Sequence, residues 1–150
     1  MDNVKYVIGQ ELVEVFEKIL KTENVFIVDK LGLDLSMAEI HTIAAIGRDR
    51  LLKMSEIAGQ LHITMGTLTV MINNLVKKGY VERYKSEEDR RIVKVGLTKG
   101  GKQIYDIHEL FHENLVDALL GNFDEKELET VSQALKNLQD FIVDNNDIRK

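Results

Sequence analysis

Residues 55–98 carry an order of local signals that few folds can satisfy. A two-turn helix beginning near Ser55 is followed by a turn at residues 62–63 and by a second helix with Thr64 as its N-cap. Gly79 ends this second helix as its C-cap. Two runs with alternating apolar side chains come next, YVERYK and RIVKVGLT, joined by the charged turn SEEDRR. The sequence therefore predicts a helix-turn-helix followed by a two-stranded hairpin, or wing.

Two helices are expected before this unit. Apolar residues recur at spacings of three and four from residue 3 to about residue 29, which is the pattern of a long amphipathic helix. Ser36 and Glu39 have the spacing of a capping box and open a second helix, which runs through Ile46 and stops at Gly47.

Two more helices are expected after the hairpin. Thr98 is placed to cap a helix that reaches about Leu120. Asp124 and Glu127 form a second capping box, and the final helix carries one apolar face made of Leu128, Val131, Leu135, Leu138 and Ile142. No Pro interrupts any of these patterns, so we expect a mainly α chain with a small β-hairpin wing.

Composition restricts the remaining possibilities. At 150 residues and 44% hydrophobic content, residues 1–150 fit one domain. No Cys is present, which favours a reducing compartment, and no apolar run approaches the roughly 18 residues of a membrane span. The N-terminal residues do not resemble a signal peptide, so we expect a cytoplasmic protein that does not enter a membrane. There is no glycine-rich phosphate loop or nucleophile elbow, and we expect no enzymatic activity.

Charge is distributed unevenly along the chain. The formal net charge is −5, yet residues 48–102 contain twelve Lys or Arg and only six Asp or Glu, a local excess of +6. A basic surface on an otherwise acidic protein is typical of one face that meets a polyanion such as DNA.

The helix after the turn has two distinct faces. Leu68, Met71, Ile72 and Leu75 fall on one side, which we expect to be buried. The opposite side carries small and polar residues that can approach base edges or phosphates: Gly66, Thr67, Val70, Asn73, Asn74 and Lys77. Such a face on an isolated helix would be simply solvated, but the preceding helix, the wing and the local charge favour DNA binding.

The segment LTVMINNLVKKGYVERYKSEEDRRIVKVGLTKGG resembles the central region of the MarR family of winged-helix transcriptional regulators. It includes the Asp-x-Arg motif of the family wing, here Asp89 and Arg91, and the Leu-Thr that leads into the next helix. The flanking helices match the family in order and length. The resemblance therefore implies a winged helix over about 36–98, with dimerisation helices over about 3–29 and 99–144.

The resemblance also implies a mode of action. Members of the family bind a pseudo-palindromic operator as homodimers, each placing one helix in the major groove and one wing along the adjacent minor groove. Asp89 can brace one arginine of the wing and leave the other, for which Arg90 is the candidate, to enter the groove. The residues expected to contact DNA are Ser55, Thr64, Gly66, Thr67, Thr69, Val70, Asn73, Asn74, Lys77, Arg83, Asp89, Arg90 and Arg91.

Within the family, residues 63–83 and the stretch IHELFH are most similar to the repressors of fatty-acid synthesis, which bind acyl-acyl carrier protein as co-repressor. The resemblance implies an effector pocket lined by Phe26, Ile27, His41, Ile104, His108 and Phe111. One feature opposes docking of an acidic carrier protein, because Asp106, Glu109, Glu113 and Asp117 crowd the same helix. The cations available for docking elsewhere are Lys18, Lys21, Lys30 and Arg48.

His108 and His112 stand four residues apart, so both imidazoles lie on one helix face and could bind zinc. Zinc-sensing repressors of the family use a matching set, here Glu23, His41, His108 and His112, although this chain lacks the cysteine of their second site. The alternatives that stay open are therefore a zinc-responsive repressor and a regulator of another small-molecule ligand.

Overall fold

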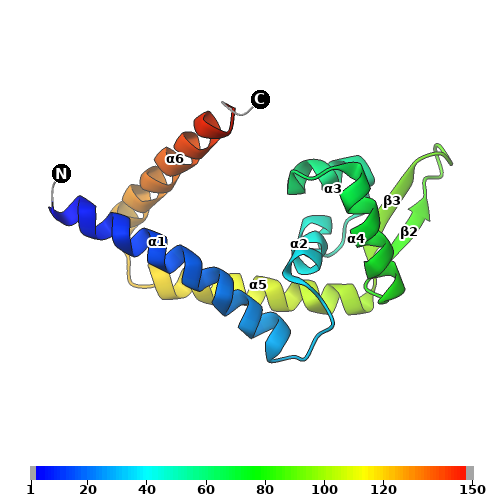
Figure 1. The fold of residues 1–150 in the computed structure, drawn as a ribbon, viewed down its shortest axis with the longest axis horizontal. Coiled ribbons are helices and arrows are strands. Elements are labelled where there is room, and N and C mark those ends of the chain that lie inside the picture. Colours follow the sequence, from blue (N-terminus) through cyan, green and yellow to red (C-terminus); the bar gives the residue numbers. More distant parts are fainter. Residues whose placement is uncertain (1–2, 148–150) are drawn as a thin grey trace. The chain divides into compact units, whose positions relative to one another are not determined.

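The computed structural model describes residues 3–147, with side chains described as far as residue 145. Helices dominate this part of the chain, and a small antiparallel sheet carries the wing, so the predicted fold class is confirmed (Figure 1). The chain forms two compact units, Met1–Phe111 and His112–Lys150. None of the described helices is both long enough and apolar enough to cross a bilayer.

Helix α1 (Asn3–Asn24) continues directly into the π-helical segment η1 (Val25–Asp29). Helical structure therefore extends to residue 29, as predicted, but the last turn is wider than an α-helical turn, and the Lys30 N–H bonds the Val25 carbonyl at 3.1 Å. Apolar spacing does not distinguish these two kinds of helix. Ile27 within η1 is fully buried and ties this end of the helix to the core.

Helix α2 (Met37–Ile46) begins with the predicted capping box. The Ser36 N–H donates to the Glu39 carboxylate at 2.9 Å, and the Glu39 N–H donates to Ser36 Oγ at 3.2 Å. Both bonds satisfy backbone groups at the start of a helix that otherwise have no helical partner. Gly47 follows the helix with φ of +83°, a backbone conformation that favours glycine.

The core of the winged helix lies between α2, α3 (Met54–Leu61) and α4 (Met65–Lys77). Helix α3 begins one residue before the predicted start. The side chains that fill the space between these helices are completely buried: Ile40, Ile43, Ile46, Ile57, Leu68, Ile72 and Leu75. Burial of these aliphatic side chains fixes the angle of α4 relative to the other two helices.

The sheet has three strands rather than the two expected. Strands β2 (Val81–Lys85) and β3 (Val93–Leu97) form the predicted hairpin, and β1 (Leu52–Lys53) pairs with the other edge of β3, giving the order β1-β3-β2. The prediction omitted β1 because two residues are too few to show an alternating pattern. Because β1 pairs with β3 and directly precedes α3, it joins the base of the wing to the start of α3.

Helix α5 (Lys99–Leu120) begins against the base of the wing. Thr98 is its cap, since Thr98 Oγ1 accepts from the Gly101 N–H at 3.1 Å. A Cβ atom at Gly101 would lie 2.1 Å from the Tyr80 carbonyl oxygen, so only glycine permits this approach.

Helix α6 (Glu125–Asp147) opens with the second predicted capping box. The Asp124 N–H donates to the Glu127 carboxylate, and the Glu127 N–H donates to the Asp124 carboxylate, both at 2.9 Å. The predicted apolar face of this helix is present, and most of its side chains are exposed, including Leu135 and Ile142.

Candidate nucleic-acid interface

Helix α4 presents the polar face that the sequence predicted. Thr64 caps the helix, accepting from the Thr67 N–H at 3.2 Å, and the side chains of Leu68, Ile72 and Leu75 are buried. The opposite side is exposed along its whole length, at Gly66, Thr67, Thr69, Val70, Asn73, Asn74 and Lys77. All of these residues are therefore accessible to DNA, and their contacts with DNA stay a prediction.

The turn between α3 and α4 sets the angle at which α4 is presented. His62 ends α3 in the left-handed conformation, with φ of 54°, and its N–H donates to the Gly59 carbonyl at 3.4 Å. Only two residues, His62 and Ile63, separate α3 from the cap at Thr64. Ser55, in the first turn of α3, is exposed as well. A short turn of this kind holds two helices in the arrangement of a helix-turn-helix.

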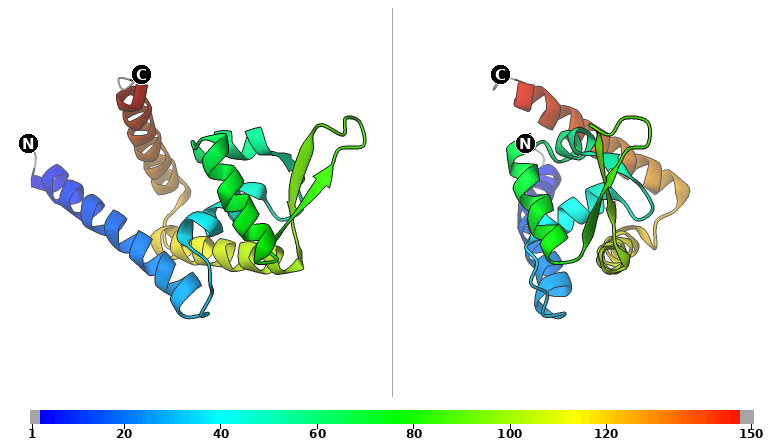
Figure 2. Two further views of the ribbon diagram at one scale, coloured as in Figure 1. Left: turned by 45° about the vertical axis from the view of Figure 1, so that its right-hand side comes forward. Right: turned by 90° about the vertical axis from the view of Figure 1, so that its right-hand side faces the viewer.

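The wing is a closed turn that projects beyond the helices. The left view of Figure 2 shows the loop between β2 and β3 extending away from α2, α3 and α4. The Ser86 N–H donates to the Ile92 carbonyl at 3.0 Å, and the Ile92 N–H donates to the Asp89 carbonyl at 2.9 Å. These bonds give the loop a defined backbone at the point where a groove would receive it.

Asp89 braces one of the two wing arginines, and that arginine is Arg91. The Asp89 carboxylate accepts from the Arg91 N–H at 3.0 Å and from Arg91 Nε at 3.2 Å. These bonds, the backbone bond above all, lower the pKa of Asp89 and keep it ionised. Arg90 beside this pair is exposed, and the Arg91 side chain is also 91% exposed. The pairing is the one expected if Arg91 shapes the turn while Arg90 is offered to the groove.

A further contact joins the wing to α4. Arg83, exposed on β2, reaches back to α4, and its Nη2 donates to Asn73 Oδ1 at 2.5 Å. Both residues belong to the set predicted to contact DNA, but their mutual bond has no sequence signal because it joins a helix to a strand. The structure therefore joins two residues that were predicted to contact DNA by a direct hydrogen bond.

Lys78 is a positioning residue that the sequence pattern did not single out. Its ammonium donates to both carboxylate oxygens of Glu39, at 3.0 and 3.1 Å, and so ties the end of α4 to the first turn of α2. Glu39 is almost fully buried. The two residues are 39 positions apart, so neither spacing nor local charge pattern could reveal the pair.

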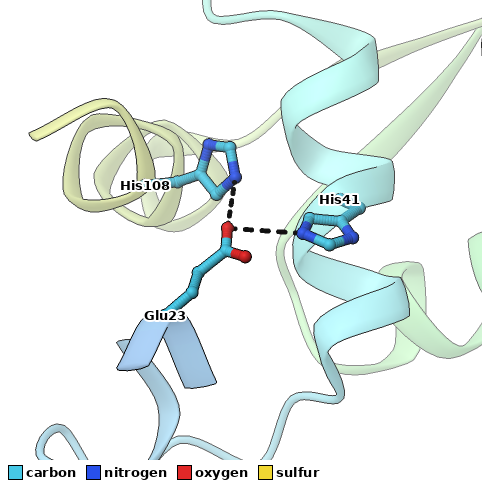
Figure 3. A group of neighbouring side chains, drawn as sticks. All are labelled: Glu23, His41 and His108. Atoms are coloured by element: carbon cyan, nitrogen blue, oxygen red, sulfur yellow. Dashed lines mark hydrogen bonds and ion pairs between the residues drawn. The ribbon is translucent and has the colours of Figure 1, made fainter. Parts of the chain in front are cut away.

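Three of the four predicted metal ligands meet in the structure (Figure 3). Glu23 Oε1 lies 3.0 Å from His108 Nε2 and 3.3 Å from His41 Nε2, and the ligand atoms of all three residues lie within 4.8 Å of one another. Glu23 and His108 are buried, and His41 is partly exposed. The fourth predicted ligand, His112, belongs to the second unit, and its role stays a prediction.

The donor set fits a zinc ion in its chemistry. Ligand atoms on a tetrahedral zinc lie about 3.3–3.5 Å apart, since Zn–N and Zn–O bonds are about 2.0–2.2 Å long. The two distances from Glu23 are near this range, and all three ligand atoms lie within 4.8 Å of one another. The same three groups can also satisfy one another by hydrogen bonds without metal.

The apolar residues of the predicted effector pocket are near Glu23 or His108 in the sequence. Ile27, Ile104 and Phe111 are buried, and the rings of Phe26 and Phe111 lie 5.5 Å apart. They come from η1, which directly follows the helix that carries Glu23, and from α5, which carries His108. The structure brings Phe26 and Phe111 together, and the effector pocket itself stays a prediction.

Comparisons with known proteins agree with this architecture. The model of the MarR family matches residues 35–93. The chain is 34% identical to the uncharacterized HTH-type transcriptional regulator YfiV of Bacillus subtilis, over 71% of each chain. It is 33% identical to the multiple antibiotic resistance protein MarR of Escherichia coli, over 69% of this chain and 73% of that protein.

The crystal structure of Streptococcus pneumoniae FabT in complex with DNA is similar with a TM-score of 0.80 and 36% identity, covering 93% of this chain and 98% of FabT. A winged helix with an exposed reading face and an arginine-tipped wing, together with these relatives, shows that the chain belongs to the MarR family of DNA-binding transcriptional regulators.

Proposed function

We propose that the protein acts as a homodimeric repressor on a pseudo-palindromic operator, with α4 in the major groove and the wing in the adjacent minor groove. The observation that carries this proposal is the arginine-bearing tip of the wing, where Asp89 holds the Arg91 backbone and side chain and both Arg90 and Arg91 are exposed. A narrow minor groove concentrates negative potential, and a guanidinium on a projecting turn is suited to enter it.

A second copy of the chain is the expected partner of two apolar surfaces. Helix α1 exposes large apolar side chains along most of its length, and Val4 and Phe16 are 62% and 60% exposed. Helix α6 does the same at Leu135, Phe141 and Ile142. A folded protein rarely leaves such long rows of large apolar side chains in water. A two-fold axis would let the same surfaces of two copies cover one another.

The DNA-binding proposal is tested by changing the tip of the wing. We expect the double substitution Arg90→Ala, Arg91→Ala to weaken specific binding at least tenfold in a gel shift at fixed salt, because it removes the groove contact and its charge. A matched variant, Lys126→Ala with Lys136→Ala, removes two exposed cations from α6 instead and should bind operator normally. Equal affinities for both variants would remove the wing from the mechanism.

For the effector, we propose acyl-acyl carrier protein, acting as co-repressor in the control of fatty-acid synthesis. This rests on the resemblance of residues 63–83 to repressors of that pathway and on the apolar side chains around Phe111. The acidic carrier needs exposed cations. Arg48 is paired with Asp106 at 2.8 Å, and Lys18 is paired with Glu14, so Lys21 and Lys30 are the better docking candidates.

Charge reversal at these lysines tests the docking surface. We expect Lys21→Glu with Lys30→Glu to abolish the gain in DNA affinity that acyl-acyl carrier protein produces, while binding without the carrier stays unchanged. The substitution Ile104→Trp should fill the predicted effector pocket, so that the acyl chain cannot enter and the same response is lost. A full response in both variants would exclude this site and this docking surface.

A zinc-responsive regulator is the second candidate, and the meeting of Glu23, His41 and His108 favours it. These residues would hold the ion, which would join α1, α2 and α5. Zinc binding requires deprotonated imidazoles, so metal affinity should fall as the pH drops below about 6.5.

Metal analysis separates the two candidates. If zinc is the effector, protein purified without a histidine tag should contain stoichiometric zinc, and EDTA should release the operator. His108→Ala should then abolish metal binding, whereas the control His62→Asn, which changes an exposed histidine in the helix-turn-helix, should retain it. If acyl carrier protein is the effector, EDTA should leave DNA binding unchanged.

A further inference from the structure

The bond between Arg83 and Asn73 determines which chemical groups α4 can offer to DNA. Asn73 lies in the middle of the exposed face of α4, one turn after Val70 and one turn before Lys77. Its side-chain oxygen accepts from Arg83 Nη2 at 2.5 Å. An unpaired asparagine presents both an acceptor and two donors, but here the acceptor is already engaged by a charged group.

The orientation of the Asn73 amide follows from its partner. Turning the amide by 180° would place its NH2 group against the guanidinium, and two donors cannot form a hydrogen bond with each other. The bound orientation therefore keeps the oxygen towards Arg83 and points the NH2 group elsewhere. Arg83 itself carries only donors. The pair as a whole can thus offer donors to DNA at this position without breaking its own bond.

Base pairs differ in how well they receive such a pair. In the major groove guanine presents two acceptors, N7 and O6, whereas adenine presents one acceptor and one donor. Cytosine presents a donor, and thymine presents a single acceptor beside a methyl group. An asparagine whose oxygen is free can bind adenine with both groups, but the Asn73 oxygen would have to share its two lone pairs between Arg83 and the adenine amino group, which makes adenine the weaker fit.

We propose that the Asn73–Arg83 pair is a specificity determinant that selects guanine, the base edge with two acceptors, at one position of each operator half-site. Arg83 acts partly through Asn73, as a positioning residue that fixes the amide. This inference rests on the proposed function, since it assumes that α4 enters the major groove.

Selection of bound duplexes from a randomised library, at fixed salt, tests the pair. The wild-type protein should prefer guanine over adenine about tenfold at one position per half-site, the discrimination expected of a good two-bond contact. In Arg83→Met the amide is free to turn, so this preference should fall to about threefold or less and adenine should become acceptable. Arg83→Lys keeps a donor for the Asn73 oxygen and should retain part of the preference.

A matched control separates readout from charge. Lys85→Met removes one exposed cation from the same strand and should weaken binding to all sequences alike, with the base preference unchanged. If Arg83→Met behaves in the same way, Arg83 contacts only phosphate and the inference is wrong. If the wild-type protein selects no sequence at all, the proposed function fails instead.

A second variant, Asn73→Asp, tests the inference even if Arg83→Met fails to fold. Asn73→Asp retains an acceptor for Arg83 but replaces the amide NH2 by a second oxygen. Because carboxylates accept from the cytosine amino group, the preferred base should change from guanine to cytosine. Retention of guanine by Asn73→Asp would overturn the inference. Asn73 is exposed, so this substitution should leave the melting temperature nearly unchanged.

Discussion

Replacing Glu39 by Ala tests how the recognition helix α4 is held against α2. The substitution removes the capping bond with Ser36 and the two bonds from Lys78. We expect loss of the cap to cost about 0.5–1 kcal/mol. Hydrogen bonds to charged groups contribute about 1.5–3 kcal/mol to stability. Loss of the Lys78 bonds to the nearly buried Glu39 carboxylate should cost about 1.5–2 kcal/mol more, near the lower end of that range, because the Lys78 side chain is 28% exposed and can turn to water. The free energy of unfolding should therefore fall by about 2–3 kcal/mol.

Urea denaturation followed by circular dichroism measures this change. All variants must be compared at one protein concentration, since dissociation of a dimer would contribute to the apparent stability. Glu127→Ala is the matched control, because Glu127 forms the same capping box with Asp124 at an exposed helix start. That control should cost only about 0.5 kcal/mol. Equal losses for Glu39→Ala and Glu127→Ala would show that the Lys78 pair contributes nothing to stability.

Acid should weaken the same contact. Burial is the largest influence on the Glu39 carboxyl and raises its pKa, but the hydrogen bonds from Ser36 and Lys78 together outweigh burial, and the folded pKa lies below the ordinary value of 4.5. A group whose pKa is lowered by folding stabilises the fold above its unfolded pKa, and this stability is lost as the pH falls through the folded pKa. The melting temperature of the wild-type protein should thus fall more steeply below about pH 4.5 than that of Glu39→Gln. Parallel curves for the two proteins would contradict this assignment.

Two further predictions concern assembly and the base of the wing. Light scattering should report a particle near twice 17.1 kDa, and a monomer at micromolar concentration would contradict the proposed homodimer. Gly101→Ala should lower the free energy of unfolding by about 1–3 kcal/mol, because its Cβ would lie 2.1 Å from the Tyr80 carbonyl oxygen. Gly100→Ala is the control, since its Cβ would be 3.6 Å from the nearest Tyr80 atom; similar losses for both variants, measured by urea denaturation, would refute the steric explanation.

Much of the fold could be predicted because its signals are local. The caps at Ser36, Thr64 and Asp124 each depend on residues at most three positions away, and the structure contains all three. The buried and exposed faces of α4 follow from helical spacing alone. The π-helical form of η1 and the two-residue strand β1 were not predicted, because the first depends on packing and the second is too short to carry a pattern.

The candidate site divides in the same way. The exposed residues of α4 and the charged wing could be predicted from the sequence. Which arginine pairs with Asp89 could not, because the pairing with Arg91 depends on the backbone of the turn. The contacts Asn73–Arg83 and Glu39–Lys78 join different elements and have no local signature. Grouping Glu23 with His41 and His108 came from resemblance to relatives, because three separate helices supply these residues.

The strand order β1-β3-β2 leaves β2 at the edge of the sheet. An edge strand has unpaired backbone groups and is a template on which another molecule can add a strand, so a projecting hairpin is a hazard for aggregation. The exposed residues of β2 include charges of both signs, Glu82, Arg83 and Lys85, and charged side chains discourage such pairing. The strand that carries Arg83, a residue proposed to contact DNA, thus also carries charges that oppose strand pairing between copies of the protein. Variants that neutralise all three charges at once should aggregate at high concentration, which favours single substitutions for studies of DNA binding.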